Sequence, residues 1–420
     1  MTDAGRLIVG DCLETMRALP ARSVHCCVTS PPYWGLRDYG MDGQVGLEAT
    51  PSAYVEKLVR VFREVRRVLR EDGTVWLNLG DSYAQRKGSG YVKAGHGKGD
   101  EHAQRHVNLW ASTGAEDLGI RERSLVGIPW LVAVALQADG WVLRSDVIWA
   151  KRNMLPESVA GWRWEPCRRK QGSRRARDQK YAAGAGHRDK RHGDLQFQQG
   201  TEWAACPGCD RCRGNGGLVL RRGSWRPTRS HEYVFQLGCS TGYFGDGDPV
   251  REANKPDPPQ RGQKVPLDLP AGRNLRDVWF LASQPSKLHH FAMMPPLLVE
   301  KCLKSSCPTH VCAACGTPWA RVVNRGTILA DAQGFRATCG CGAGAVPGTV
   351  LDPFLGAGTV AGVADHLGLR WVGCELNPKY AKLLPDRVAE VRGYYARRAG
   401  RAPRPQTQGR EQLGFFGASA

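Results

Sequence analysis

The 420-residue sequence predicts an α/β fold built on a parallel sheet. Two short apolar runs, RLIVGD and VHCCVTS, end in polar or turn residues, which is typical of buried strands. The segment SAYVEKLVRVFREVRRVLREDG carries apolar residues at helical spacing and stops at Asp72-Gly73. TVWLNLGDSY follows as another strand, and the order strand, helix, strand indicates neighbouring parallel strands.

Further elements follow later in the chain. IPWLVAVALQADGWVLRSDVIWAK predicts a helix, a turn and a strand, and SHEYVFQLGC predicts one more strand. KLHHFAMMPPLLVEKCLKSS predicts a helix that is broken near Pro295-Pro296. The last unit, GTVLDPFLGAGTVAGVADHLGLRWVGCELNPKYAKLL, predicts a strand, a glycine-rich turn, a helix and a strand that ends in an acid.

The balance of charge indicates the kind of partner. A net charge of +19 and a pI near 9.5 favour a polyanion, with nucleic acid as the first partner to consider. The start MTDAGRLIVGDC lacks a secretory pattern, and no segment approaches the ~20 apolar residues of a membrane span. We therefore expect a cytoplasmic protein, in which the fifteen cysteines are buried thiols or metal ligands.

The segment VLDPFLGAGTV carries the first candidate binding site. Its strand delivers Asp352 and Phe354 into a turn with Gly356 and Gly358, where glycines allow a ligand to approach the backbone closely. The third glycine of the dinucleotide fingerprint is missing, so pyrophosphate binding is not favoured. Glu375 ends the next strand, where an acid can accept both hydroxyls of a ribose; the alternative is an ordinary glycine turn with an incidental acid.

DPFLGAGT together with GCELNP resembles the S-adenosylmethionine-binding motifs of amino-methylating DNA methyltransferases, usually written DPFxGSGT, with Ala357 in place of the serine. SPPY at residues 30–33 resembles the catalytic tetrapeptide (D/N/S)PPY of the same family. The SPPY tetrapeptide comes first in the chain and the DPFLGAGT turn comes far later. This order resembles the permuted class of the family, which has the beta-class order of motifs. The resemblance covers roughly 1–83, 124–160, 229–245 and 275–385. It implies a Rossmann-like S-adenosylmethionine-dependent methyltransferase sheet with circularly permuted motif order.

The resemblance also implies the residues of the cofactor site. GDC resembles the position of the acid that meets the adenine ring, and HFAMMPPLLVEKC resembles the helix that closes over the methionine moiety, which includes Glu300. The implied cofactor-binding residues are Asp11, His290, Pro295, Asp352, Phe354, Gly356, Gly358, Thr359 and Glu375.

The corner Ser30-Pro31-Pro32-Tyr33 suits the chemistry that the resemblance implies. The prolines fix the backbone and donate no hydrogen bonds. An exocyclic amine needs two acceptors for its two hydrogens, and the Ser30 hydroxyl and the Pro31 carbonyl can supply them, so most of the catalytic gain comes from positioning. Tyr33 can stack on the base, which must leave the duplex to be reached. The alternative is a proline-rich turn with a packing tyrosine.

These motifs predict a site-specific methyltransferase that modifies double-stranded DNA, in a restriction-modification system or as an orphan or phage enzyme. Within the family, serine at the first corner position is typical of cytosine-N4 enzymes, and Asp or Asn is typical of adenine-N6 enzymes. We therefore expect cytosine N4, with adenine N6 as the alternative. A zinc-stabilised DNA-binding protein without catalysis is the more distant alternative.

Two groups of cysteines have the spacing of metal ligands. Cys312-x-x-Cys315 with Cys339-x-Cys341 resembles a structural zinc ribbon, and Cys307 and His310 are alternative ligands. Cys206-x-x-Cys209-x-x-Cys212 is a second group, with a fourth ligand from Cys167, His187 or His192. Segments poor in core residues fold with difficulty alone, which favours structural zinc in both over reduced, unliganded thiols.

Residues 161–193 carry eleven Lys and Arg against three acids, which predicts duplex contact as an alternative to a disordered basic loop. The candidate DNA-binding residues are Arg168, Arg169, Lys170, Arg174, Arg175 and Arg177. Near the C-terminus, Gln412–Phe416 resembles ligands of the bacterial sliding clamp, a possible second partner.

The expected organisation follows the motifs. Its segments are a catalytic half (1–160), a basic cysteine-containing insert for target recognition (161–228), a return to the core with the cofactor-closing helix (229–304), a zinc-ribbon-like insert (305–345), a cofactor-binding half (346–391) and a disordered tail (392–420).

Overall fold

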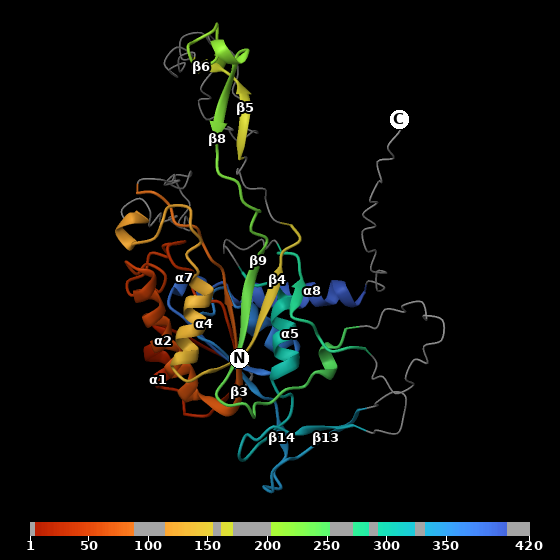
Figure 1. Ribbon diagram of the computed structural model, residues 1–420. Helices are drawn as coiled ribbons and strands as arrows, with labels where there is room; N and C mark the ends of the chain where they lie inside the picture. Colours follow the sequence, from red (N-terminus) through yellow and green to blue (C-terminus); the bar gives the residue numbers. More distant parts are fainter. Residues whose placement is uncertain are drawn as a thin grey trace, which may run out of the picture. The chain divides into compact units, whose positions relative to one another are not determined.

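Strand β2 (Val24–Thr29), buried along its whole length, lies inside an eight-stranded sheet (Figure 1). The computed structural model describes residues 5–87, 114–153, 161–170, 203–252, 272–284, 293–323 and 332–400. The chain divides into two compact units, Met1–Asn153 with Ser230–Ala420, and Met154–Arg229. We call them the sheet unit and the inserted unit and describe each separately.

The sheet combines a parallel part with an antiparallel strand. In spatial order its strands are β1 (Gly5–Val9), β16 (Arg370–Glu375), β15 (Thr349–Asp352), β2, β3 (Leu69–Leu79), β9 (His231–Gly238), β4 (Val142–Ala150) and β10 (Val278–Phe280). Neighbours from β1 to β3 are parallel, β9 is antiparallel to both of its neighbours, and β10 is parallel to β4. Strand β15 pairs with β2 through Val350 opposite Cys26 and Leu351 opposite Cys27.

Helices cover both faces of this sheet (Figure 1). One face carries α1 (Cys12–Arg17), α2 (Pro51–Val68) and α4 (Ile128–Ala138), and the other carries α5 (Pro296–Ser306), α6 (Thr359–His366) and α8 (Leu384–Ala399). Because neighbouring side chains of a strand point to opposite faces, Cys27 joins the core under α2 and Cys26 joins the core under α5. Each face therefore has its own apolar core.

The crossovers place a ligand site between β15 and β2. The connection from β15 to β16 runs through α6 on one face, and the connection from β2 to β3 runs through α2 on the other. In open α/β sheets the point where crossovers diverge leaves a crevice at the carboxyl ends of the strands, where ligands bind. The predicted α/β fold is thus confirmed, while its assignment to the permuted class remains a prediction.

Two element boundaries differ from the sequence predictions. The helix expected to end at Asp72-Gly73 ends at Val68, because Leu69 is already extended and pairs with Val24 on β2. The tail expected to be disordered from residue 392 is helical to Ala399, because α8 buries Val391 and Tyr395.

The cysteine-containing segment after α5 forms two small sheets within the sheet unit. Strand β11 (Val311–Cys312) pairs with β14 (Ala345–Val346), and β12 (Ala320–Val323) pairs with β13 (Ala332–Arg336). His25 on β2 anchors this segment, because its Nδ1 accepts from the Thr349 N–H (3.1 Å) and its Nε2 lies 3.0 Å from the Gly316 carbonyl. The His25 ring thereby ties two parallel strands to the loop that follows Cys315.

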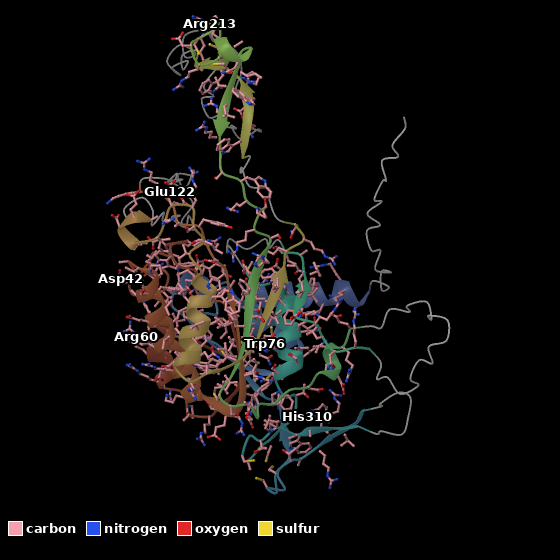
Figure 2. All side chains as sticks on the ribbon, viewed as in Figure 1. Asp42, Arg60, Trp76, Glu122, Arg213 and His310 are labelled. Atoms are coloured by element: carbon pink, nitrogen blue, oxygen red, sulfur yellow. The ribbon has the colours of Figure 1, made fainter. Side chains whose placement is uncertain are left out.

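The inserted unit is built from two short antiparallel pairs. Strand β5 (Trp162–Pro166) pairs with β8 (Leu218–Arg222), and β6 (Arg168–Lys170) pairs with β7 (Trp203–Ala205). Figure 2 shows the exposed side chain of Arg213, in the short 3₁₀ helix of this unit (Arg213–Asn215). The remaining short helices, in the sheet unit, are Glu116–Leu118, Asp248–Val250 and α7 (Pro378–Ala381). Across the described residues, no helix has the length and apolar character that a membrane crossing needs.

The return from the cysteine-containing segment to β15 leaves no space for a side chain at Gly348. A Cβ there would lie 2.4 Å from the Pro308 carbonyl oxygen, a backbone atom that cannot rotate away. We predict that Gly348→Ala lowers the free energy of unfolding by about 2–3 kcal/mol. Gly247→Ala is the matched control, because a Cβ at Gly247 meets nothing within 4 Å and its φ is −76°. Chemical denaturation of both variants measures the difference, and equal stabilities would contradict the steric argument.

Candidate active site

One pocket at the carboxyl edge of the sheet brings together the two stretches that the sequence singled out. Ser30, Pro31, Pro32 and Tyr33 line it from the end of β2, and the glycine turn after β15 lines it from the other side. The pocket encloses about 900 Å³ of empty space, part of it continuous with solvent. This volume suits a small organic ligand. The pocket lies at the crevice that the crossovers predict.

Glu375 ties the glycine turn to the end of β16. Its Oε2 accepts from the Gly356 N–H and its Oε1 accepts from the Asn377 N–H, each at 2.8 Å. Gly356 has φ +55°, a conformation that favours glycine. Burial raises the pKa of the Glu375 carboxyl to about 6. Since each oxygen has a further lone pair, the carboxylate can still accept hydroxyl hydrogens from a ligand.

Asp352 lies behind the pocket wall at the end of β15 and is only 2% exposed. Its Oδ1 accepts from the Thr29 hydroxyl (2.7 Å) and from the Phe354 N–H (3.0 Å). Burial raises the pKa of this carboxyl to about 7, although both hydrogen bonds oppose the shift. Asp352 thus holds β2 and β15 together at their ends.

The Ser30–Tyr33 corner is fixed by contacts on several sides. The Tyr54 hydroxyl donates to the Pro32 carbonyl (2.9 Å), which holds the corner to α2. Gly80, just after β3, leaves room for the Tyr33 ring, because a Cβ there would lie 2.5 Å from its Cε2 atom. Burial, followed by the nearby Glu232 carboxylate, raises the pKa of the Tyr33 hydroxyl well above its usual range.

Behind the corner lies a cluster of polar side chains, which we call the Glu232 cluster: Asn78 on β3, Glu232 on β9, Lys151 directly after β4, and Tyr33 of the corner. The Tyr33 hydroxyl donates to Glu232 Oε2 (2.6 Å), and the Asn78 amide donates to the same oxygen (2.9 Å). Lys151 forms an ion pair with Glu232 Oε1. The pair is mostly buried, with side chains 16% and 13% exposed.

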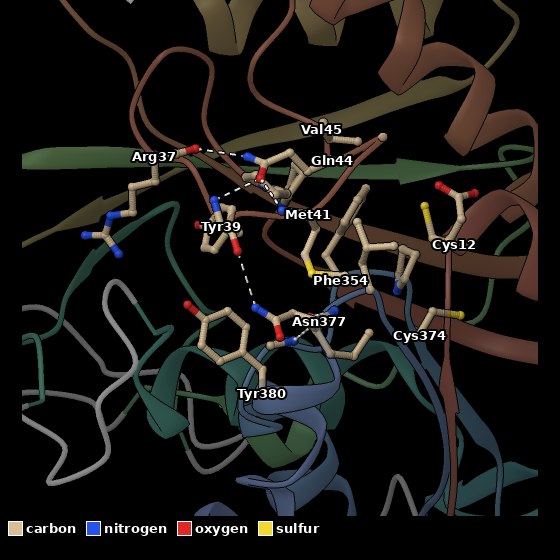
Figure 3. A pocket seen from close by; sticks show the side chains of 18 of the residues that line it. Cys12, Arg37, Tyr39, Met41, Gln44, Val45, Phe354, Cys374, Asn377 and Tyr380 are labelled. Atoms are coloured by element: carbon tan, nitrogen blue, oxygen red, sulfur yellow. Dashed lines mark hydrogen bonds between the residues drawn. The ribbon is translucent and has the colours of Figure 1, made fainter. Parts of the chain in front are cut away.

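The loop after the corner, residues 36–45, lines the pocket, and Figure 3 shows its side chains opposite Asn377 and Tyr380. Gln44 holds the loop in shape, because its Oε1 accepts from the Tyr39 N–H (2.8 Å) and its Nε2 donates to the Arg37 carbonyl (3.2 Å). Asn377 Nδ2 donates to the Tyr39 carbonyl (3.4 Å), and the rings of Tyr39 and Tyr380 meet edge to face. The loop therefore links the corner to the residues that follow Glu375.

The predicted site residues fall into three groups. All four corner residues line the pocket, as do four of the predicted cofactor residues: Asp11, Phe354, Gly356 and Glu375. Four others are described but do not line it: Pro295, Asp352, Gly358 and Thr359. His290 lies outside the described residues.

Two of these residues, and Glu300 of the predicted cofactor-closing helix, have local structural contacts. Asp11 caps α1, with its Oδ1 accepting from the Leu13 N–H (2.8 Å). The Thr359 hydroxyl accepts from the Arg387 guanidinium (3.1 and 3.2 Å) inside the core. Glu300 pairs with Lys304 and accepts from the Tyr395 hydroxyl (3.0 Å).

Sequence reasoning missed the Glu232 cluster and the loop at residues 36–45. Glu232 belongs to SHEYVFQLGC, which predicted only a strand, and Asn78 belongs to TVWLNLGDSY. Both are polar residues inside otherwise apolar strands, and such residues are enriched at functional sites. That was the one signal available, and it could not identify their partners.

Eight of the fifteen cysteines form two groups of four. Cys167, Cys206, Cys209 and Cys212 form one group and Cys312, Cys315, Cys339 and Cys341 form the other, with all sulfurs of a group within 4.8 Å of one another. In the first group three sulfur pairs lie 3.7, 3.8 and 3.9 Å apart. Zn–S bonds of ~2.3 Å in a tetrahedron place sulfurs ~3.8 Å apart, so the spacing fits zinc. Cys167 is thus the fourth cysteine of its group.

The alternative zinc ligands that the sequence offered either lie outside the two cysteine groups or fall outside the described residues. Cys307 is buried in the core under α5, and the His310 ring stacks on Phe335. His187 and His192 lie outside the described residues.

The inserted unit carries exposed aromatic and basic side chains. Trp162 and Trp225 are 68% and 70% exposed, and the Arg222 guanidinium lies over the Trp162 ring. Arg168 and Arg169 lie on β6 and are exposed. Lys170 ends that strand, while Arg174, Arg175, Arg177 and the tail motif Gln412–Phe416 lie outside the described residues.

Comparisons with known proteins agree with this arrangement. A family model described as DNA methylase, for N6 and N4 enzymes, matches residues 24–385. The Type II methyltransferase M.XycI of Xanthomonas campestris pv. cyanopsidis is 32% identical over 383 residues, covering 91% of this chain and 87% of the relative. M.SmaI of Serratia marcescens is 32% identical over 387 residues, covering 92% and 91%.

Among solved structures, the PvuII DNA methyltransferase (cytosine-N4-specific) is 13% identical with a TM-score of 0.46, covering 94% of this chain and 93% of that one. The family model spans most of the chain and includes both halves of the pocket. The chain belongs to the N6/N4 family of DNA methylases.

Proposed function

We propose that this DNA methyltransferase transfers a methyl group from S-adenosylmethionine to the N4 amine of a cytosine flipped out of double-stranded DNA. The observation that carries the proposal is the pocket in which the Ser30–Tyr33 corner faces the glycine turn. One side of this pocket offers acceptors for an amine, and the other offers a cradle for a nucleoside. A methyl donor and a methyl acceptor thus meet in one cavity.

The residues of the glycine turn fit the cofactor. Gly356 allows backbone approach, Glu375 retains lone pairs for the ribose hydroxyls, and Phe354 offers an apolar surface beside them. When bound, S-adenosylmethionine supplies an electrophilic methyl group on a sulfonium. The buried Asp352 carboxyl behind the wall places negative charge near this cationic ligand whenever it is ionised.

The corner holds the attacking amine. The Ser30 hydroxyl and the Pro31 carbonyl accept its two hydrogens, which turns the nitrogen lone pair towards the methyl group. The backbone of the two prolines is rigid, so the acceptors are positioned before the base arrives. The Tyr33 ring stacks on the base after it leaves the duplex.

The choice of cytosine over adenine rests on Ser30, the residue type that stands first in the cytosine-N4 enzymes of the family. Adenine N6 is the second candidate, because it presents the same kind of exocyclic amine to the same acceptors. The relatives named M.XycI and M.SmaI are Type II methyltransferases, so we propose that this chain likewise modifies one recognition sequence in a restriction-modification setting.

We assign duplex contact to the inserted unit. Residues 203–229 carry six arginines and one acid, and Arg168 and Arg169 add to this positive surface. Arginine contacts to phosphates supply affinity, and contacts to base edges supply sequence choice. We further assign structural zinc to both groups of four cysteines, which lie in segments with few buried apolar side chains.

The reaction and the base are tested together by methyl transfer and product analysis. DNA is incubated with labelled S-adenosylmethionine, and its nucleosides are separated by mass spectrometry. We expect N4-methylcytosine, and we expect Ser30→Ala to lower the transfer rate by about 100-fold through lost positioning.

Ser23→Ala is the matched control, because the Ser23 hydroxyl donates to the Pro20 carbonyl just before β2 and Ser23 does not line the pocket. N6-methyladenine as the product would overturn the cytosine assignment and keep the reaction. A chain that binds DNA and cofactor but transfers no methyl group would overturn the reaction itself.

The raised pKa of Asp352 predicts a pH-dependent cofactor affinity. The carboxyl is half ionised at about pH 7, and its ionised form attracts a cationic ligand. The affinity for S-adenosylmethionine should therefore rise as the pH increases from 6 to 7.5 and level off above that. Titration calorimetry measures the profile, and Asp352→Asn should remove the rise near pH 7, leaving only the part near pH 6 at which Glu375 titrates. Any titration of S-adenosylmethionine itself affects both proteins equally. Identical profiles for the wild type and Asp352→Asn would therefore show that the charge of Asp352 does not affect cofactor affinity.

Metal content tests the zinc assignment. Elemental analysis of the purified chain should find two zinc ions, one for each group of four cysteines. Cys209→Ser should lower the content to about one, whereas Cys239→Ser, outside both groups, should leave it unchanged. A metal-free chain that unfolds at the same temperature with and without added zinc would refute this assignment.

A further inference from the structure

Glu232 places a mostly buried negative charge behind the corner without lining the pocket. It enters from β9, the antiparallel strand, and its carboxylate meets Tyr33 from the corner after β2, Asn78 from β3, and Lys151 directly after β4. An acid in this position costs free energy unless it is paired and hydrogen-bonded, and here every contact is with a donor.

The two oxygens of Glu232 have different partners. Oε1 faces the Lys151 ammonium, which also lies 4.6 Å from the centre of the Trp149 ring. Oε2 accepts from the Tyr33 hydroxyl (2.6 Å) and from the Asn78 amide (2.9 Å). The ion pair thus fixes which oxygen faces the corner.

These contacts give the hydrogen bonds a direction. The single hydrogen of the Tyr33 hydroxyl is committed to Glu232, so the Tyr33 oxygen can only accept from its other neighbours. It accepts from the Asn78 amide (2.9 Å), and the Ser30 hydroxyl lies 3.4 Å away. Asn78 keeps this orientation although its Oδ1 is buried with no hydrogen-bond partner among the described residues.

Within the cluster, the Ser30 hydroxyl can therefore donate its hydrogen bond to only one partner. Asn78 Nδ2 (3.4 Å) is a donor, and the Tyr33 oxygen is an acceptor. Both contacts are long, so the hydroxyl is held weakly and can adjust when an amine arrives. With its hydrogen turned to Tyr33, a lone pair on Ser30 is left for the amine.

We propose that Glu232 is a positioning residue that keeps Ser30 a hydrogen-bond acceptor by drawing the hydroxyl hydrogens of Tyr33 and Ser30 towards itself. This inference rests on the proposed function, in which Ser30 accepts a hydrogen from the target amine. Glu232 acts through Tyr33 and touches neither the base nor the cofactor.

The variant Glu232→Gln tests the direction of the hydrogen bonds with almost no change in shape. Lys151 has only hydrogens to offer, so it captures the one oxygen of the glutamine amide and leaves the NH₂ group facing Tyr33. The Tyr33 oxygen then accepts from this group, and its hydrogen turns to Ser30, which loses its free acceptor. We expect single-turnover methyl transfer to slow by about tenfold, with unchanged S-adenosylmethionine affinity.

The double variant Lys151→Met with Glu232→Gln should recover most of the lost rate. Without the ammonium, the glutamine oxygen is free to face Tyr33 and Asn78, and the original direction returns. The double variant also lacks an unpaired buried charge, so it stays folded where the single variant is weakened. Asp246→Asn is the control, because it removes the similarly buried partner of Arg321 away from the pocket and should leave the rate unchanged.

The outcomes separate this inference from the proposed function. The role of Glu232 would be overturned if Glu232→Gln transferred methyl groups at the wild-type rate. It would also be overturned if the double variant were as slow as Glu232→Gln alone. A wild-type rate for Ser30→Ala would instead overturn the proposed amine acceptor. Recovery in the double variant, together with a slow Ser30→Ala, supports both.

Discussion

The hydrogen bond from the Thr29 hydroxyl to Asp352 joins the ends of two neighbouring parallel strands, and the site depends on that junction. These residues are 323 positions apart in the chain, yet β2 and β15 end at the same edge of the sheet. Because crossovers leave from this point to opposite faces, a crevice opens between the segments that follow the two strands. The corner fills one side of the crevice and the glycine turn fills the other. Neither half forms a site without the other.

Three buried or nearly buried carboxylates surround this crevice, and each is satisfied differently. Glu375 accepts from backbone N–H groups, Asp352 from a hydroxyl and a backbone N–H, and Glu232 from a tyrosine, an amide and an ammonium. The chain as a whole carries a net charge of +19. The positive surface attracts a polyanion, while the acids at the crevice favour a cation. This separation lets one protein hold a cationic donor and an anionic polymer together.

The sequence alone predicted the parallel sheet, the corner, the glycine turn and Glu375, because these features depend on residues that are close together in the chain. Ser30–Tyr33 is a rigid tetrapeptide, and Gly356 and Gly358 mark a turn whatever lies around them. The Glu232 cluster could not be predicted, because its members lie on or directly after four different strands, β2, β3, β4 and β9, whose order is set by packing. The end of α2 was misplaced for a similar reason: Asp72-Gly73 is a good helix stop, but pairing with β2 takes Leu69 into the sheet first.

The inserted unit follows a different principle from the sheet unit. Among its described residues Cys212 is the only buried side chain, whereas the sheet unit has two large apolar cores. Two short strand pairs bury too little apolar surface to offset the conformational entropy of ordering them. Four sulfurs gathered at tetrahedral spacing can replace the missing core if they hold the proposed zinc. If this unit contacts DNA as proposed, target recognition would depend on the metal while the cofactor pocket depends on the sheet, so the two could be lost independently.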